Sequence, residues 1–143
     1  MDLLASCRPP CEDSRIVASA VKASELEESF RQRVEKSATK LGMIGVAYDL
    51  NGPAGKGATY AAAAAGVGIG AYVDKDPRRD VADISFRVVD KSVDLNRILR
   101  TVAPKLGASG GGHAEACGAR VPLDKLNEFF EAINNMLTPR VAP

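Results

Sequence analysis

The sequence predicts an α/β or α+β fold, in which helices pack on a small mixed β-sheet of about four to five strands. Two features carry this prediction. Segments whose apolar residues recur at helical spacing alternate along the chain with short runs of β-branched residues. Within one such run, residues 81–89, apolar and polar residues alternate, as expected for a strand with one buried face. A chain of 143 residues is long enough for one domain with a core.

The N-terminal part is expected to hold a linker and then a helix. Its first residues combine two prolines with polar residues and show no firm periodicity. Ser24 and Glu27 then form the pattern of a capping box, and the apolar residues that follow predict a helix to Leu41, stopped by Gly42. The predicted division of the chain is a linker or flexible segment, a domain and a tail, at residues 1–23, 24–138 and 139–143.

The middle of the domain is predicted from short β-branched runs and one alanine-rich run. The alanines favour a helix because they lose no side-chain entropy, and their small face lets a sheet approach closely. Asp74 to Pro77 has the composition of a turn between two strands. The expected elements are a strand, a helix and two further strands, at residues 43–50, 58–65, 67–74 and 81–89.

The C-terminal part is expected to contain two amphipathic helices and a short strand. Asp94 can cap the first helix, and Pro104 falls late enough in it to distort its last turn. A brief extended run at residues 116–121 follows the glycine-rich stretch. A final helix over residues 124–137 has apolar residues on one face.

Four glycines and the chain's one histidine occur within the ten residues from Ser109 to Gly118. Glycines cost entropy on ordering, so a folded protein keeps them where φ is positive or where another group approaches the backbone. The amides of Gly110, Gly111 and Gly112 could converge on a phosphate, with His113 as a further donor. A glycine-rich turn beside a structural histidine is the alternative.

Arg87 and Ser85 lie on the polar face of the predicted strand 81–89. If this face lines a groove, the guanidinium and the hydroxyl could bind phosphate oxygens together. A solvated strand face explains the same pattern, and it is the more common case for alternating polar residues.

Composition and residue types exclude several other functions. The formal net charge of +1 gives no overall field toward nucleic acid, and no apolar run approaches the length of a membrane span, so a cytoplasmic protein without membrane contact is expected. One histidine cannot supply a two-metal site. Cys117 is expected to be buried rather than a nucleophile. No catalytic residue and no metal ligand are therefore assigned.

The run from Gly110 to Gly118 resembles the glycine-histidine motif of the DHH-associated domain, type one, of the Asp-His-His phosphoesterase superfamily. The strand with Ser85, Phe86 and Arg87 resembles the S-x-R strand of that family, and the likeness extends over roughly residues 25–137. Cys117 departs from the small alanine or serine that is usual there.

The resemblance implies a substrate-binding lobe of the oligoribonuclease, nucleotide phosphatase or single-strand exonuclease kind. The phosphate-binding residues it implies are Ser85, Arg87, Gly110, Gly111, Gly112 and His113, and the ligand is a nucleotide or single-stranded oligonucleotide. In the family, a separate lobe holds manganese, and the Asp-His-His motif of that lobe cannot occur in a chain with one histidine. The chain itself is therefore expected to need no cofactor and to be inactive alone.

Three hypotheses remain open at this point. The first is a nucleotide-binding or nucleic-acid-binding module without its catalytic lobe. The second is a phosphodiesterase or phosphatase that becomes active when a longer product or a partner supplies the DHH lobe. The third is an interaction domain, such as a homodimerisation domain, with a vestigial glycine loop.

Overall fold

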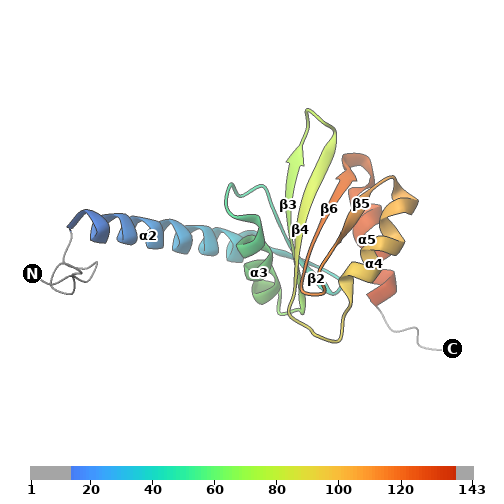
Figure 1. The fold of residues 1–143 in the computed structure, drawn as a ribbon, viewed down its shortest axis with the longest axis horizontal. Helices are drawn as coiled ribbons and strands as arrows, with labels where there is room; N and C mark the ends of the chain where they lie inside the picture. Colours follow the sequence, from blue (N-terminus) through green and yellow to red (C-terminus); the bar gives the residue numbers. More distant parts are fainter. Residues whose placement is uncertain (1–13, 138–143) are drawn as a thin grey trace, which may run out of the picture.

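The computed structural model describes residues 14–137, which form one six-stranded mixed sheet packed between helices (Figure 1). The strand order is β1-β2-β3-β4-β6-β5, and β2 and β3 are the one parallel pair. The predicted α+β class is therefore confirmed, with more strands than expected. The elements are α2 (Ser14–Ser37), β1 (Thr39–Leu41), β2 (Ile44–Tyr48), α3 (Ala54–Ala65), β3 (Ile69–Asp76), β4 (Val81–Val88), α4 (Leu95–Val102), β5 (Ser109–Gly112), β6 (Ala116–Pro122) and α5 (Leu126–Leu137).

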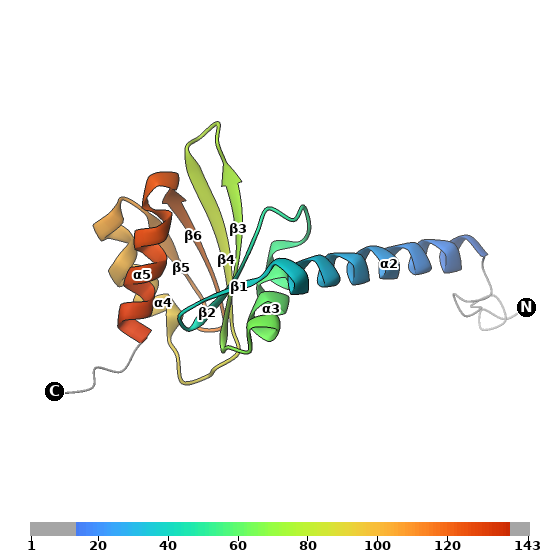
Figure 2. The same ribbon diagram turned by 180° about the vertical axis from the view of Figure 1, so that it is seen from behind.

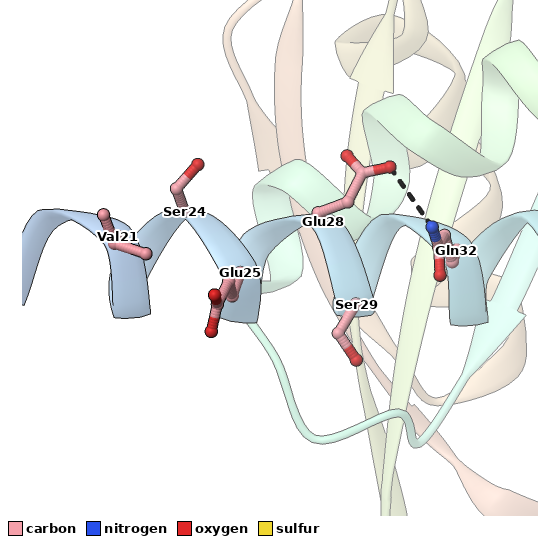
Figure 3. A pocket seen from close by; sticks show the side chains of 6 residues that line it. All are labelled: Val21, Ser24, Glu25, Glu28, Ser29 and Gln32. Carbon is pink, nitrogen blue, oxygen red and sulfur yellow. Dashed lines mark hydrogen bonds between the residues drawn. The ribbon is translucent and has the colours of Figure 1, made fainter.

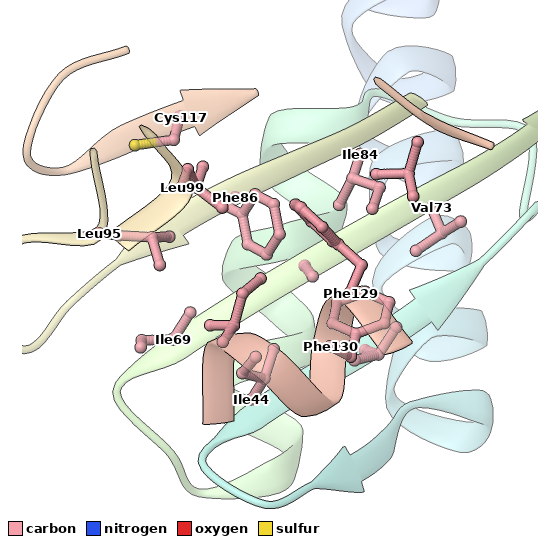
Figure 4. Packing of buried hydrophobic residues seen from close by; sticks show 14 of the residues in the cluster. Ile44, Ile69, Val73, Ile84, Phe86, Leu95, Leu99, Cys117, Phe129 and Phe130 are labelled. Atoms are coloured by element: carbon pink, nitrogen blue, oxygen red, sulfur yellow. The ribbon is translucent and has the colours of Figure 1, made fainter. Parts of the chain in front are cut away.

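Helices cover the two faces of the sheet unequally. On one face α4 and α5 enclose the main core, where the rings of Phe86, Phe129 and Phe130 pack against one another (Figure 4). On the other face α3 packs on β2, β3 and β4, and the C-terminal half of α2 adds Phe30 and Val34 to a smaller core (Figure 2). The packing of α3 stops at β4, so the part of this second face over β6 is exposed, as at Gly118.

Small residues allow α3 to lie close to the sheet. A side chain at Gly45 would collide with the carbonyl of Ala61, and one at Gly70 would collide with the carbonyl of Ala58. The alanine face of α3 is fully buried at Ala58 and Ala61. The prediction that the alanine-rich helix permits close approach of the sheet is thus confirmed, although the helix begins four residues earlier, at Ala54.

Several other predicted elements are confirmed. In β4, Ile84, Phe86 and Val88 are buried, whereas Asp83 on the other face is exposed. The carboxylate of Asp94 accepts a hydrogen bond from the backbone N–H of Arg97 and so caps α4. As predicted, the helix is distorted at Pro104, where residues 103–106 form a 3-10 turn.

The expected start and end of the first helix were wrong. Helix α2 begins at Ser14, so Ser24 lies inside it rather than at its cap. No glycine or proline occurs in residues 11–41, so nothing in that stretch interrupts the helix. The last residues of the predicted helix form β1, which pairs with β2 through a tight turn in which Gly42 has φ of 63°. Residues 1–13 of the predicted linker and the predicted tail 139–143 lie outside the described residues.

The turn between β3 and β4 lies later than expected. Asp74 to Asp76 belong to β3, and the turn occupies residues 77–80, where Asp80 has φ of 58°. The β3 and β4 pairing runs from Ile69 opposite Val88 to Asp76 opposite Val81, which makes this hairpin the longest antiparallel pair of the sheet. Aspartate accepts the left-handed backbone that closes it.

Helix α2 extends away from the body of the domain in both views (Figures 1 and 2). Residues 18–29 are all exposed, and Val21 and Leu26 are the large apolar side chains among them. A shallow hollow along this part of the helix is lined by polar residues around Val21 (Figure 3). None of the helices in residues 14–137, α2 included, combines the length and apolar character needed to cross a bilayer.

Candidate functional site

The candidate site begins with the polar face of β4, which carries Ser85 and Arg87. The alternation of β4 places their side chains opposite the buried ring of Phe86, on the face that α3 covers only in part. Ser85 lies opposite Gly118 of β6, and Arg87 lies opposite Ala116. Residues that are directly opposite in an antiparallel pair share a face, so β6 presents only small residues beside both polar side chains.

His113 lies in the same row across the sheet as Arg87. The backbone N–H of His113 donates to the carbonyl of Ala116 at 2.9 Å, and Ala116 is the partner of Arg87 on the other side. Two inter-strand spacings, about 10 Å, therefore separate the backbones of Arg87 and His113. His113 itself is exposed and Arg87 is partly buried. The register thus places the backbones of these two predicted site residues in one row across the sheet.

The three glycines form a strand and not a nest of converging amides. Gly110, Gly111 and Gly112 pair with Ala119, Gly118 and Cys117 of β6, so their N–H groups alternate in direction. The N–H of Gly112 already donates to Oδ1 of Asn96 on α4 at 3.0 Å. The amides therefore do not converge as expected, because successive N–H groups of a paired strand point in opposite directions.

Backbone geometry explains why glycine occurs at two of these positions. Gly111 and Gly112 have φ of 153° and 148°, which residues with a side chain rarely adopt. A Cβ at Gly112 would also lie 2.6 Å from the carbonyl oxygen of Ala116. Gly111 and Gly112 therefore have structural reasons to be glycine, whatever ligand the face binds.

The guanidinium of Arg87 is held by backbone and packing contacts. Its Nη1 donates to the carbonyl of Phe86 at 2.9 Å, and its other end abuts Gly55 in the first turn of α3, where any side chain would collide with it. Within residues 14–137 it forms no ion pair, whereas nearby Lys56 pairs with Glu27 at 3.0 Å. Arg87 also lines a hollow of about 540 Å³ beside α3. The guanidinium is thus oriented and retains an uncompensated charge.

Cys117 is buried against the backbone of His113. The residue is 5% exposed, and its thiol donates to the carbonyl of His113 at 2.9 Å. Burial, with a smaller contribution from Asp94, raises the pKa of the Cys117 thiol, against an opposing effect of Arg87. A thiol with a raised pKa is protonated and unreactive at neutral pH, so the predicted burial of Cys117 is confirmed.

In the described part of the chain, no three or more histidine, cysteine, aspartate or glutamate side chains come together as a metal site. The side chains predicted to form the candidate face, those of Ser85, Arg87 and His113, are hydrogen-bond donors or cations and not carboxylates. They fit an anionic ligand and do not fit a resident manganese ion.

Two residues of this region have no signal in the sequence, and a third, Gly118, lies in the predicted glycine-rich run but was given no role. Asn96 accepts from both Gly112 and the side chain of Arg100, which ties α4 to β5. Gly55 provides the space for Arg87. Gly118 of β6 is paired with Ser85 on one side and with Gly111 on the other, so these three residues form the row next to that of Arg87 and His113. The sequence gives no local signal for Asn96 or Gly55, because both contacts depend on how helices pack on the sheet.

Comparisons with solved structures show that other proteins share this fold. A DHH-domain protein described as a member of the s1p family of ribosomal proteins has a TM-score of 0.60 and 20% identity, covering 85% of this chain and 32% of that one. A pGpG-specific phosphodiesterase, PggH from Vibrio cholerae, has a TM-score of 0.58 and 14% identity, covering 80% and 39%. This chain spans about a third to two fifths of those two proteins.

The chain belongs to the DHHA1 domain family, because a model of that family matches residues 49–138. This confirms the resemblance to a DHH-associated domain, and the match begins after α2, β1 and β2. The C-Ala domain of alanyl-tRNA synthetase from Aquifex aeolicus shares the fold with a TM-score of 0.52 and 16% identity, covering 71% of this chain and 97% of that one. A sequence comparison with curated proteins finds no match.

Proposed function

We propose that this domain is a substrate-binding lobe that holds the phosphate of a nucleotide or of a short single-stranded oligonucleotide. The binding face consists of Ser85 and Arg87 on β4, of Gly111 in β5 and of His113, which directly follows β5. The observation that carries the proposal is the row formed by Arg87, Ala116 and His113, in which two potential phosphate ligands flank a small residue.

The charge of the face supports an anionic ligand. Arg87 has a fixed guanidinium without a carboxylate partner among the described residues, and the planar fork of arginine suits phosphate oxygens. Ser85 lies two residues away on the same face and can donate its hydroxyl. Membership of the DHHA1 family and a phosphodiesterase among the solved structures of this fold make nucleotide phosphates the natural class of ligand.

In this proposal the hydrolytic step belongs to a separate DHH lobe, which a longer product or a partner supplies. Manganese would be held by that lobe, since the described residues provide no ligand set for it. The role of this domain is then to orient the phosphate and the chain end toward the catalytic lobe, which lowers the entropic cost of reaching the reactive geometry.

The proposal is tested by fluorescence anisotropy with a labelled single strand of about five nucleotides. We expect weak binding whose affinity falls with salt, with a log–log slope of about −0.7 for each phosphate contact. Arg87→Ala should weaken binding by about tenfold or more, because a charge-assisted hydrogen bond to phosphate is lost.

Arg78→Ala is the matched control, because it removes the same charge from the exposed turn between β3 and β4, away from the candidate face. We expect that variant to bind like the wild type. Equal losses in both variants would indicate a nonspecific charge effect, and an unchanged affinity in Arg87→Ala would contradict the proposed site. Circular dichroism checks that both variants are folded.

A further inference from the structure

Helix α4 and the turn that follows it carry positive charge without a nearby carboxylate partner. Between Asp94 and Glu115 the chain has no acidic residue, although the protein as a whole has a formal net charge of only +1. The side chains of Arg97, Arg100 and Lys105 are exposed in this stretch, and none of them forms an ion pair within the part of the chain that the structure describes. We call these three residues the α4 basic strip.

The α4 basic strip lies on the solvent side of the helix. The opposite side is buried and consists of Leu95, Leu99 and Val102. Arg97 and Arg100 are three positions apart, so they are neighbours on the helix surface, and Lys105 follows in the 3-10 turn. With a rise of about 1.5 Å per helical residue, the strip is about 12 Å long, which equals three to four phosphate spacings of about 3.4 Å in a stacked strand.

The strip adjoins the proposed binding face at the edge of the sheet. Strand β5 is the edge strand, and α4 packs beside it (Figure 1). Oδ1 of Asn96 accepts hydrogen bonds from Nε of Arg100 at 3.2 Å and from the N–H of Gly112 at 3.0 Å. Nε of Arg100 also lies 3.6 Å from the position that a Cβ would take at Gly111. Because His113 directly follows Gly112, the strip begins next to the residues that are proposed to hold a phosphate.

We propose that the α4 basic strip binds the phosphates of a single strand beyond the phosphate held at the face, so that the domain selects oligonucleotides over mononucleotides. The inference rests on the proposed function and narrows its ligand to a strand that continues along the edge formed by β5 and α4. A nucleoside monophosphate held at the face has no further phosphate for the strip. Residues 95–114 contain no aromatic side chain, so the strip recognises the length of a strand and not its base sequence.

The test compares two ligands, a nucleoside 5′-monophosphate and a hexanucleotide of the same base, by NMR titration. The wild type should bind the hexanucleotide at least about tenfold more tightly, because additional phosphate contacts release additional counterions. Arg97→Ala combined with Lys105→Ala removes two charges and leaves the hydrogen bonds of Asn96 intact. In this double variant the salt slope for the hexanucleotide should decrease in magnitude by about 1.4, which is about 0.7 for each lost phosphate contact, and the affinity for the monophosphate should not change.

Lys36→Ala combined with Lys40→Ala is the matched control. It removes two exposed charges without an ion-pair partner among the described residues, at and just before β1 on the opposite edge of the sheet. Equal losses in the two double variants would indicate a general charge effect and overturn the inference. Tighter binding of a hexa-aspartate peptide than of the hexanucleotide would also overturn it, in favour of an acidic protein surface.

The outcomes separate this inference from the proposed function. Wild-type affinity and salt slope for the hexanucleotide in the variant of Arg97 and Lys105, together with weak monophosphate binding in Arg87→Ala, would overturn the inference and leave the proposed function intact. Wild-type affinity for the monophosphate in Arg87→Ala would contradict the proposed face itself. Circular dichroism checks that each variant is folded.

Discussion

At the scale of single residues, the candidate face depends on side chains that the protein holds in place through its own backbone. Arg87 donates to the carbonyl of Phe86, and the carbonyl of His113 accepts from the thiol of Cys117. Both contacts use backbone groups, so neither neutralises the cationic or donor groups that would meet a phosphate. The geometry is thus fixed without a carboxylate that would compete with an anionic ligand.

The protonation state of Cys117 gives a prediction at this scale. Because burial raises the pKa of the thiol, little thiolate exists at a pH of about 8, and the sulfur is also shielded from solvent. We expect iodoacetamide to alkylate Cys117 at least about tenfold more slowly in the folded protein than in denaturant. Mass spectrometry of the peptide that contains Cys117 measures this. Equal rates in both conditions would show that the thiol is accessible and not held against His113.

The sequence predicted some of these residues and not others, for a physical reason. Ser85 and Arg87 follow from the alternation of one strand, which is a local property. Asn96 and Gly55 act across elements, so no local pattern indicates them. The converging amides expected for Gly110 to Gly112 were wrong because β6 supplies a hairpin partner, and successive N–H groups of a paired strand point in opposite directions.

At the scale of elements, the β3 and β4 hairpin contains an unfavourable charge pair. Asp74 lies directly opposite Asp83, and burial together with the charges of Asp49 and Asp83 raises the pKa of the Asp74 carboxyl. Like charges directly opposite one another destabilise a sheet. Arg120 compensates Asp83 through an ion pair at 2.7 Å, which leaves Asp74 as the uncompensated member.

Asp74→Asn should therefore stabilise the protein by about 0.5 kcal/mol at neutral pH, a value kept small because the side chain is exposed to solvent. The folded-state pKa is raised, so the destabilisation is complete above that pKa, declines as the pH falls from it toward the unfolded value of about 3.9, and is absent below the unfolded value. Urea unfolding at pH 7 and pH 3 measures the difference. Glu131→Gln, on the exposed side of α5, is the control. A gain that persists at pH 3 would contradict this electrostatic origin.

Helices and strands were predictable where a pattern in neighbouring residues indicated them. The alternation of β4 and the capping residue of α4 identified both elements nearly to their ends. The start of α2 was missed because a capping pattern in the middle of a continuous helix resembles a true start. The strand β1 was missed because Leu41 continues the apolar spacing of the preceding helix, and only pairing with β2 makes residues 39–41 a strand.

At the scale of the whole molecule, helices cover one face of the sheet to form the main core, whereas part of the other face is exposed. The main core lies between the sheet and the helices α4 and α5, whereas α3 covers only β2, β3 and β4 of the opposite face. Strand order could not be derived from the sequence, because β6 inserts between β4 and β5 in the sheet. This insertion brings Arg87 and His113 into one row. The sequence therefore indicated which residues could form the site, but not how they are arranged.

The most direct test of the account maps ligand contacts on the folded domain by NMR. A titration of the ¹⁵N-labelled protein with a short single-stranded oligonucleotide should shift the amide resonances of Ser85, Arg87, His113 and Gly118. Those of Phe129 and Ile133 in α5, on the opposite side of the sheet, should not move. Shifts that instead gather on α5 or on the exposed part of α2, with β4 and β6 unaffected, would contradict the phosphate-binding face.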